Sequence, residues 1–174
     1  MDTALLRLLL AEPYYAAPPP KTTGRELFHL PYLRGALARH GAAVAPEDLV
    51  ATVTRLTAVT VADAVRAVGG TEVVASGGGT RNATLTAMVR AALGGVPLRT
   101  SDELGLPSAA KEAYAFAVLG FLTVHGLAGT LPSCTGARQA RLLGSVTPGR
   151  HGLRLPPPAA SAPVRLTLKR TIAD

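Results

Sequence analysis

Hydrophobic residues recur at helical spacing between residues 46 and 68, and this is the clearest periodic pattern in the chain. Pro46 suits the first position of a helix, and the acidic pair Glu47 and Asp48 complements the positive end of the helix dipole. Gly69 and Gly70 end the pattern. The positions spaced three and four apart predict one face in the core: Leu49, Val53, Leu56, Thr60, Ala64 and Val68.

Other helices follow from weaker signals. Residues 2–10 predict a short helix with Asp2 as its N-cap. Residues 82–93 predict a second one. Residues 108–125 are apolar nearly all round, which is typical of a central, buried helix. Residues 30–44 are weakly patterned, and we expect a loop with a helical turn there.

Short segments at residues 72–76, 97–100 and 142–146 have the composition of strands. The first contains a continuous apolar run, which is typical of a strand buried on both faces in a parallel sheet. The alternation of helices and strands predicts an α/β fold, with helices packed on a small mixed sheet. In such folds ligands bind at the carboxyl ends of parallel strands, and a run of glycines follows residues 72–76 at such an end.

The glycine turn, residues 77–79, is therefore the main candidate for ligand contact. Gly77, Gly78 and Gly79 lack a Cβ, so the backbone there can take positive φ and let another molecule approach the peptide groups. The N–H groups at the next helix start, near Asn82, attract anions and polar ligand edges. A dinucleotide fingerprint is excluded because Asn82 stands where its third glycine belongs.

Several other motifs give weaker evidence for a functional site. Residues 21–26 combine cations, hydroxyls and a glycine, but the three prolines before Lys21 supply no N–H groups, which excludes a phosphate loop. This loop either faces a cleft or caps a helix that starts near Glu26. The scattered histidines show no ligand spacing, so no structural metal is expected. Cys134 is expected to be a small buried apolar residue, and a lone cysteine fits a reducing, cytoplasmic compartment.

The net charge of +7 is largely in residues 150–174, which hold five basic residues and one acidic residue. This Pro- and Arg-rich stretch lacks the aromatic residues that stack on bases, so we expect a flexible tail after a domain at residues 1–149, and no nucleic-acid partner. No apolar stretch reaches the ~18 to 20 residues that span a bilayer. The leucine-rich start is interrupted by Arg7 and lacks a cleavage site, so we expect neither a signal peptide nor a membrane partner.

Lys111 and Glu112 are charged residues at the start of the apolar segment 108–125. Burying an unpaired charge costs several kcal/mol or shifts its pKa. Two interpretations follow. Both side chains lie in an exposed first turn, where Glu112 only favours the helix N-terminus, or Glu112 points into a cleft and accepts hydrogen bonds from a polyhydroxylated ligand.

Six stretches, taken together and in order, are similar to one family. They include the prolines followed by Lys-Thr-Thr-Gly-Arg-Glu, the Gly-Gly-Gly-Thr-Arg-Asn turn, Asp-Glu-Leu-Gly-Leu-Pro, Lys-Glu-Ala and Leu-Pro-Ser-Cys-Thr-Gly-Ala-Arg, and they occupy residues 12–15, 18–28, 77–82, 102–107, 111–113 and 131–138. Over residues 1–149 the chain resembles the carboxyl-terminal half of the anhydro-N-acetylmuramic acid kinases, members of the actin-like sugar-kinase superfamily.

The resemblance implies the carboxyl-terminal lobe, with a ribonuclease-H-like core, of a two-lobed cytoplasmic kinase that uses ATP and Mg²⁺. Members open the 1,6-anhydro ring of anhydro-N-acetylmuramic acid with water and transfer the γ-phosphoryl group of ATP to the 6-oxygen. The product is N-acetylmuramic acid 6-phosphate, in peptidoglycan recycling and amino sugar catabolism. The resemblance places Gly77, Gly78 and Gly79 against the nucleotide with Asn82 nearby, and it favours the second interpretation of Glu112, as a sugar contact.

The chain also departs from the family. The family's Gly-Thr-Ser-x-Asp-Gly and Asp-Thr-Gly-Pro-Gly-Asn segments and its catalytic aspartate have no counterpart in this sequence, so no catalytic residue is assigned. Phosphoryl transfer needs the phosphates, metal and attacking oxygen held together, and we expect the chain to be a fragment that is nearly inactive alone. The alternative is a non-catalytic nucleotide-binding module. It would dock on a separate amino-terminal lobe or form a homodimer.

Overall fold

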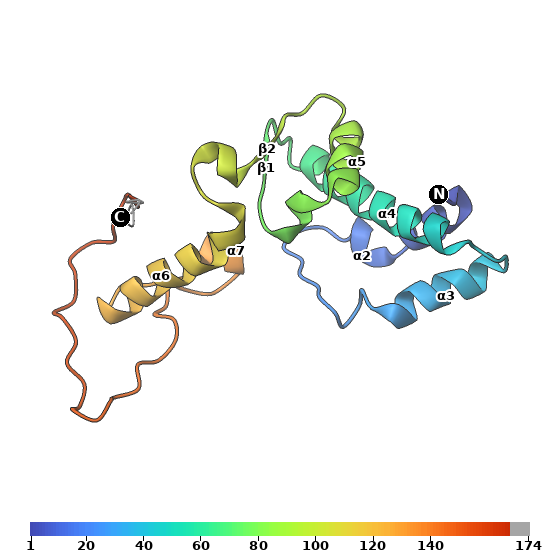
Figure 1. The fold of residues 1–174 in the computed structure, drawn as a ribbon. Helices are drawn as coiled ribbons and strands as arrows, with labels where there is room; N and C mark the ends of the chain where they lie inside the picture. Colours follow the sequence, from blue (N-terminus) through green and yellow to red (C-terminus); the bar gives the residue numbers. More distant parts are fainter. Residues whose placement is uncertain (168–174) are drawn as a thin grey trace. The chain divides into compact units, whose positions relative to one another are not determined.

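The computed structural model describes residues 1–167, and they divide into two compact units, the first ending at Lys111 and the second beginning at Glu112. Figure 1 shows the elements along the chain. In the first unit they are α1 (Thr3–Leu10), α2 (Pro13–Ala16), α3 (Leu30–His40), α4 (Pro46–Ala67), β1 (Val73–Ala75), α5 (Ala83–Leu93) and β2 (Leu98–Thr100), with the 3-10 helices η1 (Gly78–Arg81), η2 (Ser101–Leu104) and η3 (Ser108–Ala110). Then follow α6 (Lys111–Val124) and α7 (Pro132–Thr135).

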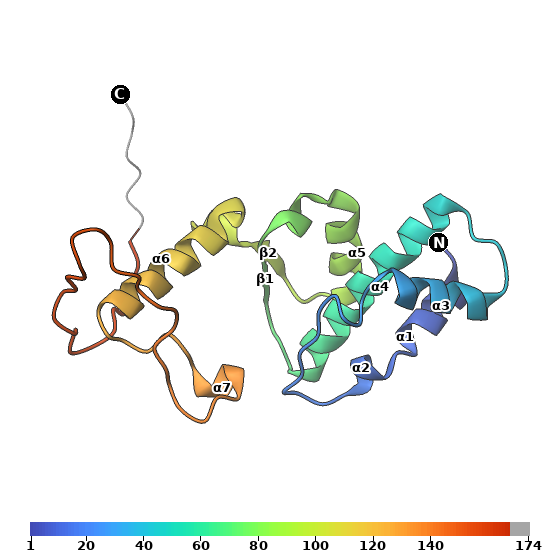
Figure 2. The same cartoon turned by 90° about the horizontal axis from the view of Figure 1, so that it is seen from below.

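Helix α1 begins as the sequence predicts, because Oδ1 of Asp2 accepts a hydrogen bond from the N–H of Leu5 at 2.8 Å. The helix packs against α3 and α4, as Figure 2 shows. Leu5 and Leu9 are fully buried there with Ala36 of α3 and, at 8% exposed, Leu56 of α4. These four side chains form one of the two apolar clusters of the first unit.

Helix α3 occupies most of the stretch that was predicted to be a loop with a helical turn. Nδ1 of His29 accepts a hydrogen bond from the N–H of Tyr32 at 3.4 Å at its start, and Gly41 ends it in the left-handed conformation, at φ 72°. Its apolar periodicity is weak, but Ala36 is fully buried against α1 and α4. Tertiary packing thus stabilises a helix that local signals alone do not indicate.

The helix expected near Glu26 is absent. The N–H groups of Leu27 and Phe28 both bond back to the carbonyl of Gly24, at 3.3 and 3.1 Å, and form a turn. The interpretation of residues 21–26 as the cap of a helix there is therefore wrong.

Strands β1 and β2 pair in parallel, with Val73 opposite Leu98 and Ala75 opposite Thr100. This confirms the predicted parallel arrangement of these two strands, but the prediction of a mixed sheet is wrong for the described residues, because no third strand pairs with them. Helices α4 and α5 pack against this pair through the second apolar cluster, which is centred on Ala58, Ala62, Val89 and Leu93. Val74 is 47% exposed, so the prediction of a strand buried on both faces is wrong. Successive strand side chains point to opposite faces, and the helices cover one of them.

Helix α6 differs from its prediction in burial. Residues 108–110 form η3 instead of the first α-helical turn, and no residue of α6 is buried. Phe116 is 71% exposed and Phe121 is 45% exposed. The apolar sequence predicted a central position, but the described part of the second unit offers only the short α7 and loops to cover this helix.

Residues 142–146 form a loop that runs beside α6, so the predicted last strand is wrong. The hydroxyl of Thr123 donates to the carbonyl of Leu143 at 2.6 Å, and the N–H of Gly129 donates to the carbonyl of Arg141 at 2.9 Å. A strand needs a neighbouring strand to satisfy its backbone groups, and the second unit supplies none within its described residues.

The tail from residue 150 to 167 has no helix or strand, apart from an isolated bridge between Gly149 and Gly152. It contacts the end of α6, where the N–H of Ala159 donates to the carbonyl of His125 at 3.0 Å. Lys169 and Arg170, part of the predicted basic tail, lie outside the described residues. Cys134 in α7 is exposed, which corrects the expectation of a buried thiol.

Candidate functional site

The glycine turn directly follows β1 and carries the positive φ that its sequence predicts. Gly77 has φ 91° and ψ −174°, a conformation that essentially only glycine adopts. Thr80 closes the turn, because its hydroxyl and its N–H both donate to the carbonyl of Gly77, at 2.7 and 3.2 Å. The turn therefore lies at the carboxyl end of a parallel strand, where α/β folds bind their ligands.

The outer side of the turn is open. A Cβ added to Gly77 or Gly78 would meet no atom within 4 Å, and one added to Gly79 would lie at ordinary contact distance, 3.7 Å, from Leu85. Another molecule can therefore come close to these peptide groups. The arrangement fits the predicted contact between the backbone and a polar ligand.

Asn82 has a structural role at the start of α5. Its Oδ1 accepts a hydrogen bond from the N–H of Leu85 at 3.0 Å, which is the usual N-cap interaction. Its side chain thus satisfies one of the free N–H groups of the helix. A ligand contact through Asn82 stays a prediction.

Three serine hydroxyls that sequence reasoning did not single out meet beside the turn. Ser101, at the end of β2, donates to Ser76, at the end of β1, with an Oγ–Oγ distance of 3.0 Å. The hydroxyl of Ser108 lies 3.3 Å from that of Ser101. Hydroxyl residues at the carboxyl ends of two predicted parallel strands were the available signal, because such ends lie side by side.

Asp102 orders the outer end of this group. Its carboxylate accepts hydrogen bonds from both the hydroxyl and the N–H of Ser108, the latter at 3.1 Å. These two bonds, the hydroxyl one first, hold the pKa of Asp102 below its ordinary value, and the positive charge of Arg81 adds to the effect. The neighbouring Glu103 also has a lowered pKa, because it accepts hydrogen bonds from the N–H and then the hydroxyl of Thr100.

A cavity of about 180 Å³ lies among α4, α5 and the two strands. Its wall is mainly apolar, and Ser76, Gly79 and Thr100 belong to it at the carboxyl ends of the strands. Pockets for drug-sized ligands are ~300–1,000 Å³. This cavity alone therefore encloses at most part of a nucleotide.

Glu112 lies in the first turn of α6, with an exposed side chain, and Lys111 before it is also exposed. The two charged residues thus avoid burial and lie in an exposed first turn, as the first interpretation of Glu112 expects. Its carboxylate is open to hydrogen-bond donors of a ligand. Its role as a sugar contact stays a prediction.

The loop after the prolines acquires a structural role through Lys21. Its Nζ donates to the carbonyls of Tyr14 and Tyr15, at 3.0 Å each, and lies 4.9 Å from the ring centre of Tyr14. The carbonyl of Tyr14 also accepts the N–H of Ala17 at 3.2 Å, and the lysine gives the carbonyl of Tyr15, near the end of α2, a donor. This contact accounts for the lysine of the motif, and the cleft-facing interpretation of residues 21–26 is left untested.

Residues 1–167 contain no group of three or more His, Cys, Asp or Glu side chains that could hold a metal ion. Nor does any helix there have the length and apolar content to cross a bilayer.

Comparisons with known proteins all point to one family. Residues 1–149 match the family described as anhydro-N-acetylmuramic acid kinase. The protein of that name from Streptomyces avermitilis is 74% identical over 165 residues, which are 95% of this chain and 43% of the relative. Those from Streptomyces coelicolor and Rhodococcus erythropolis are 63% and 57% identical, over 94% and 95% of this chain and 41% of each relative. The chain therefore spans about two fifths of the length of these relatives, and it belongs to the anhydro-N-acetylmuramic acid kinase family.

Proposed function

We propose that this chain forms the carboxyl-terminal lobe of an ATP-dependent kinase of 1,6-anhydro-N-acetylmuramic acid. The observation that carries the proposal is the family match over residues 1–149, which includes the open glycine turn at the carboxyl end of β1. The reaction consumes water, ATP and the anhydro-sugar. It breaks the bond from the anomeric carbon to the 6-oxygen, and it yields ADP and N-acetylmuramic acid 6-phosphate.

In this proposal the glycine turn contacts the nucleotide. Residues 77–79 present main-chain groups without side chains over them, so a nucleotide can lie directly against the backbone. The small adjoining cavity accepts only part of such a ligand, which agrees with a nucleotide held between two lobes. Asn82 contributes mainly by fixing the start of α5 next to this surface.

Glu112 binds the sugar in the same proposal. An ionised carboxylate accepts two or more hydrogen bonds, and the hydroxyl and amide groups of an amino sugar supply such donors. The exposed first turn of α6 leaves it accessible. It positions the substrate, and the proton of the attacking water is removed by a group outside this sequence.

Mg²⁺ would be held mainly by the phosphates of ATP. This ion usually keeps several waters and takes one or two carboxylates besides the phosphates, so it needs no all-protein cage. When bound, the ion neutralises charge that develops on the transferred phosphoryl group.

We further propose that the 174 residues do not catalyse this reaction by themselves, because they lack the family's phosphate-binding segments and catalytic aspartate. A chimera tests both statements. This chain replaces the matching stretch of the Streptomyces avermitilis relative, and ATP-dependent formation of the 6-phosphate is measured for the chimera and for the chain alone. We expect an active chimera and an inactive chain. Phosphorylation by the chain alone would refute its incompleteness, and a folded but inactive chimera would refute the proposed function.

Glu112→Gln in the chimera tests the sugar contact, because glutamine keeps the shape and loses the charge. We expect the KM for the anhydro-sugar to rise at least tenfold, which corresponds to about 1.4 kcal/mol. Glu72→Gln, at an exposed residue just before β1, is the matched control, and we expect no effect on this KM. An unchanged KM in the Glu112 variant would remove this residue from the site.

A second candidate function is a nucleotide-binding module that docks on a separately encoded amino-terminal lobe. It is favoured by the parallel pair itself, because within residues 1–167 each strand has only one partner strand and an outer edge without one. Such edges accept further strands. Mixing the chain with the unmatched remainder of the Streptomyces avermitilis relative, as a separate polypeptide, distinguishes the two. Restored activity supports docking, whereas activity confined to the chimera supports a single-chain enzyme.

A further inference from the structure

We propose that Ser101 is a positioning residue that holds the base of the glycine turn for the nucleotide. This inference rests on the proposed function, since it concerns the same surface. Ser101 is 4% exposed, and it is one of the few buried polar residues in the described part of the chain. Its hydroxyl spans the gap between the ends of β2 and β1.

The direction of the hydrogen bonds follows from the strength of the acceptors. The hydroxyl of Ser108 donates to the carboxylate of Asp102, and a carboxylate is a stronger acceptor than a hydroxyl. With its proton committed, Ser108 can only accept from Ser101, at 3.3 Å, so it competes with Ser76 for the single hydroxyl proton of Ser101. The shorter bond of Ser101, at 3.0 Å, is donated to Ser76.

This bond matters because Ser76 directly precedes Gly77. The outer side of the turn has no packing, since a Cβ at Gly77 or Gly78 would meet nothing within 4 Å. Its conformation therefore depends on bonds at its base. Thr80 supplies those within the turn, and Ser101 supplies the bond that joins the turn to the neighbouring strand.

Asp102 acts one step further away. By accepting from both the hydroxyl and the N–H of Ser108 it anchors η3 to the end of β2 and holds Ser108 beside Ser101. An asparagine in its place offers one acceptor oxygen instead of two. The hydroxyl and the N–H of Ser108, which bond to different carboxylate oxygens of Asp102, would then have to share that one oxygen.

Amide exchange in the 174-residue chain tests the positioning without any ligand. The N–H groups of Thr80 and Asn82 bond within the turn, at 3.2 and 3.1 Å, and report on it. We expect Ser101→Ala to speed their exchange about three- to tenfold, the range for one lost hydrogen bond. Ser76→Ala should speed the exchange of these amides by a similar factor. The double variant should exchange no faster than either single variant, because the two residues share one bond.

Thr84→Ala, at an exposed residue in the first turn of α5, is the matched control and should leave these amides unchanged. Exchange in α1 should be unaffected by every variant. Unchanged exchange at Thr80 and Asn82 in the Ser101 variant, or full additivity of the two serine variants, would overturn the inference.

Kinetics of the chimera test whether Ser101 affects nucleotide binding. We expect Ser101→Ala to raise the KM for ATP about three- to tenfold and to leave the KM for the anhydro-sugar unchanged, a split that general destabilisation would not produce. Equal effects on both values would overturn the positioning role. If the folded chimera has no activity, the proposed function fails, and with it the nucleotide as the ligand of this turn, while the exchange experiment still decides whether Ser101 holds the turn.

Discussion

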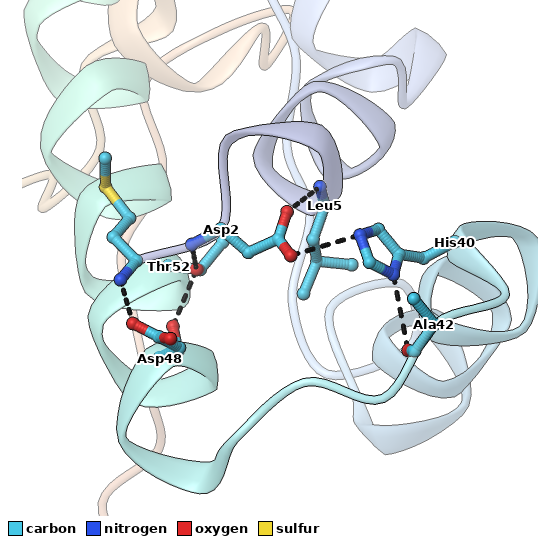
Figure 3. Close-up of polar contacts among 7 residues, drawn as sticks. Asp2, Leu5, His40, Ala42, Asp48 and Thr52 are labelled. Carbon is cyan, nitrogen blue, oxygen red and sulfur yellow. Dashed lines mark hydrogen bonds and ion pairs between the residues drawn. The ribbon is translucent and has the colours of Figure 1, made fainter.

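Nε2 of His40, at the end of α3, lies 3.1 Å from Oδ2 of Asp2, at the start of α1 (Figure 3). The other carboxylate oxygen of Asp2 accepts the N–H of Leu5, and the N–H of Asp2 donates to the hydroxyl of Thr52 in α4, at 2.8 Å. That hydroxyl in turn donates to the carbonyl of Asp48 at 2.6 Å. One acidic residue therefore joins the three helices that enclose Leu5 and Leu9.

Asp2 should make the stability of the chain sensitive to acid. The N–H of Leu5, and to a smaller extent His40, hold its pKa below the ordinary value of 3.8. A depressed pKa in the folded state gives stability that is complete above the ordinary pKa and is lost as the pH falls through the lower, folded value. We expect the urea midpoint to fall below about pH 4.

The variant Asp2→Asn isolates this effect, because asparagine remains a good N-cap but does not titrate. We expect a smaller loss of stability between pH 5 and pH 2.5 than in the parent chain. Part of the loss should persist, because Asp102 and Glu103 also have lowered pKa values. An identical pH profile for parent and variant would contradict this role of Asp2.

Leu9 should be among the most sensitive positions for stability. It is fully buried in the apolar cluster of α1, α3 and α4. Leu9→Ala should lower the free energy of unfolding by about 2–5 kcal/mol, because it removes buried methyl groups and leaves a cavity. Val50→Ala, at a residue of α4 that is 63% exposed, should change it by less than about 0.5 kcal/mol. Equal effects in urea unfolding would show that this cluster does not form.

Tyr32 should make stability sensitive to alkali. Its hydroxyl donates to the carbonyl of Leu9 at 2.7 Å, and burial, as the main cause, raises its pKa well above the ordinary value of 10.0. A raised pKa in the folded state gives stability that is complete below the unfolded pKa and is lost as the pH rises through and beyond it. Tyr32→Phe should cost about 1 kcal/mol at pH 7 and should reduce the loss of stability between pH 9 and pH 11. A profile as steep as that of the parent would contradict the prediction.

The sequence predicted those parts of the fold that rest on local signals. Asp2 and Pro46 indicated two helix starts, and the run of glycines indicated a strand end, because capping and backbone freedom act within a few residues. The α3 helix and the exposure of α6 depend on which surfaces pack against them, and apolar periodicity does not specify a partner. Residues 142–146 have strand composition but no strand beside them in the described part of their unit.

The candidate site was predictable to a similar extent. Gly77 could be found because its conformation excludes other residues. The sequence could nominate Ser76 and Ser101 as hydroxyls at two strand ends, but not the bond between them, because the bond depends on the register of two strands separated by a helix. Once β1 and β2 are known to be parallel, the residues after each strand are expected to be neighbours.

Variants of Asn82 test whether this residue caps α5, contacts the nucleotide, or does both. Asn82→Ala should lower the free energy of unfolding by about 1 kcal/mol, because the N–H of Leu85 loses its acceptor, and Asn82→Asp should retain the cap. If the nucleotide lies near this residue, the added negative charge of the aspartate variant should raise the KM of the chimera for ATP. An unchanged free energy of unfolding in the alanine variant would exclude the capping role. An unchanged KM for ATP in the aspartate variant would place the phosphates elsewhere.

Gly77 and Gly78 form a matched pair that separates folding from ligand contact. Gly77→Ala should cost about 1–3 kcal/mol, because its φ of 91° is strained for any residue with a Cβ. Gly78 does not have a positive φ, and the space beside it is open, so Gly78→Ala should change the free energy of unfolding by less than about 0.5 kcal/mol. Its new methyl group would nevertheless occupy the surface on which the nucleotide is proposed to lie. In the chimera we therefore expect a higher KM for ATP from Gly78→Ala at unchanged stability, and normal kinetics in that variant would show that the nucleotide does not approach this side of the turn.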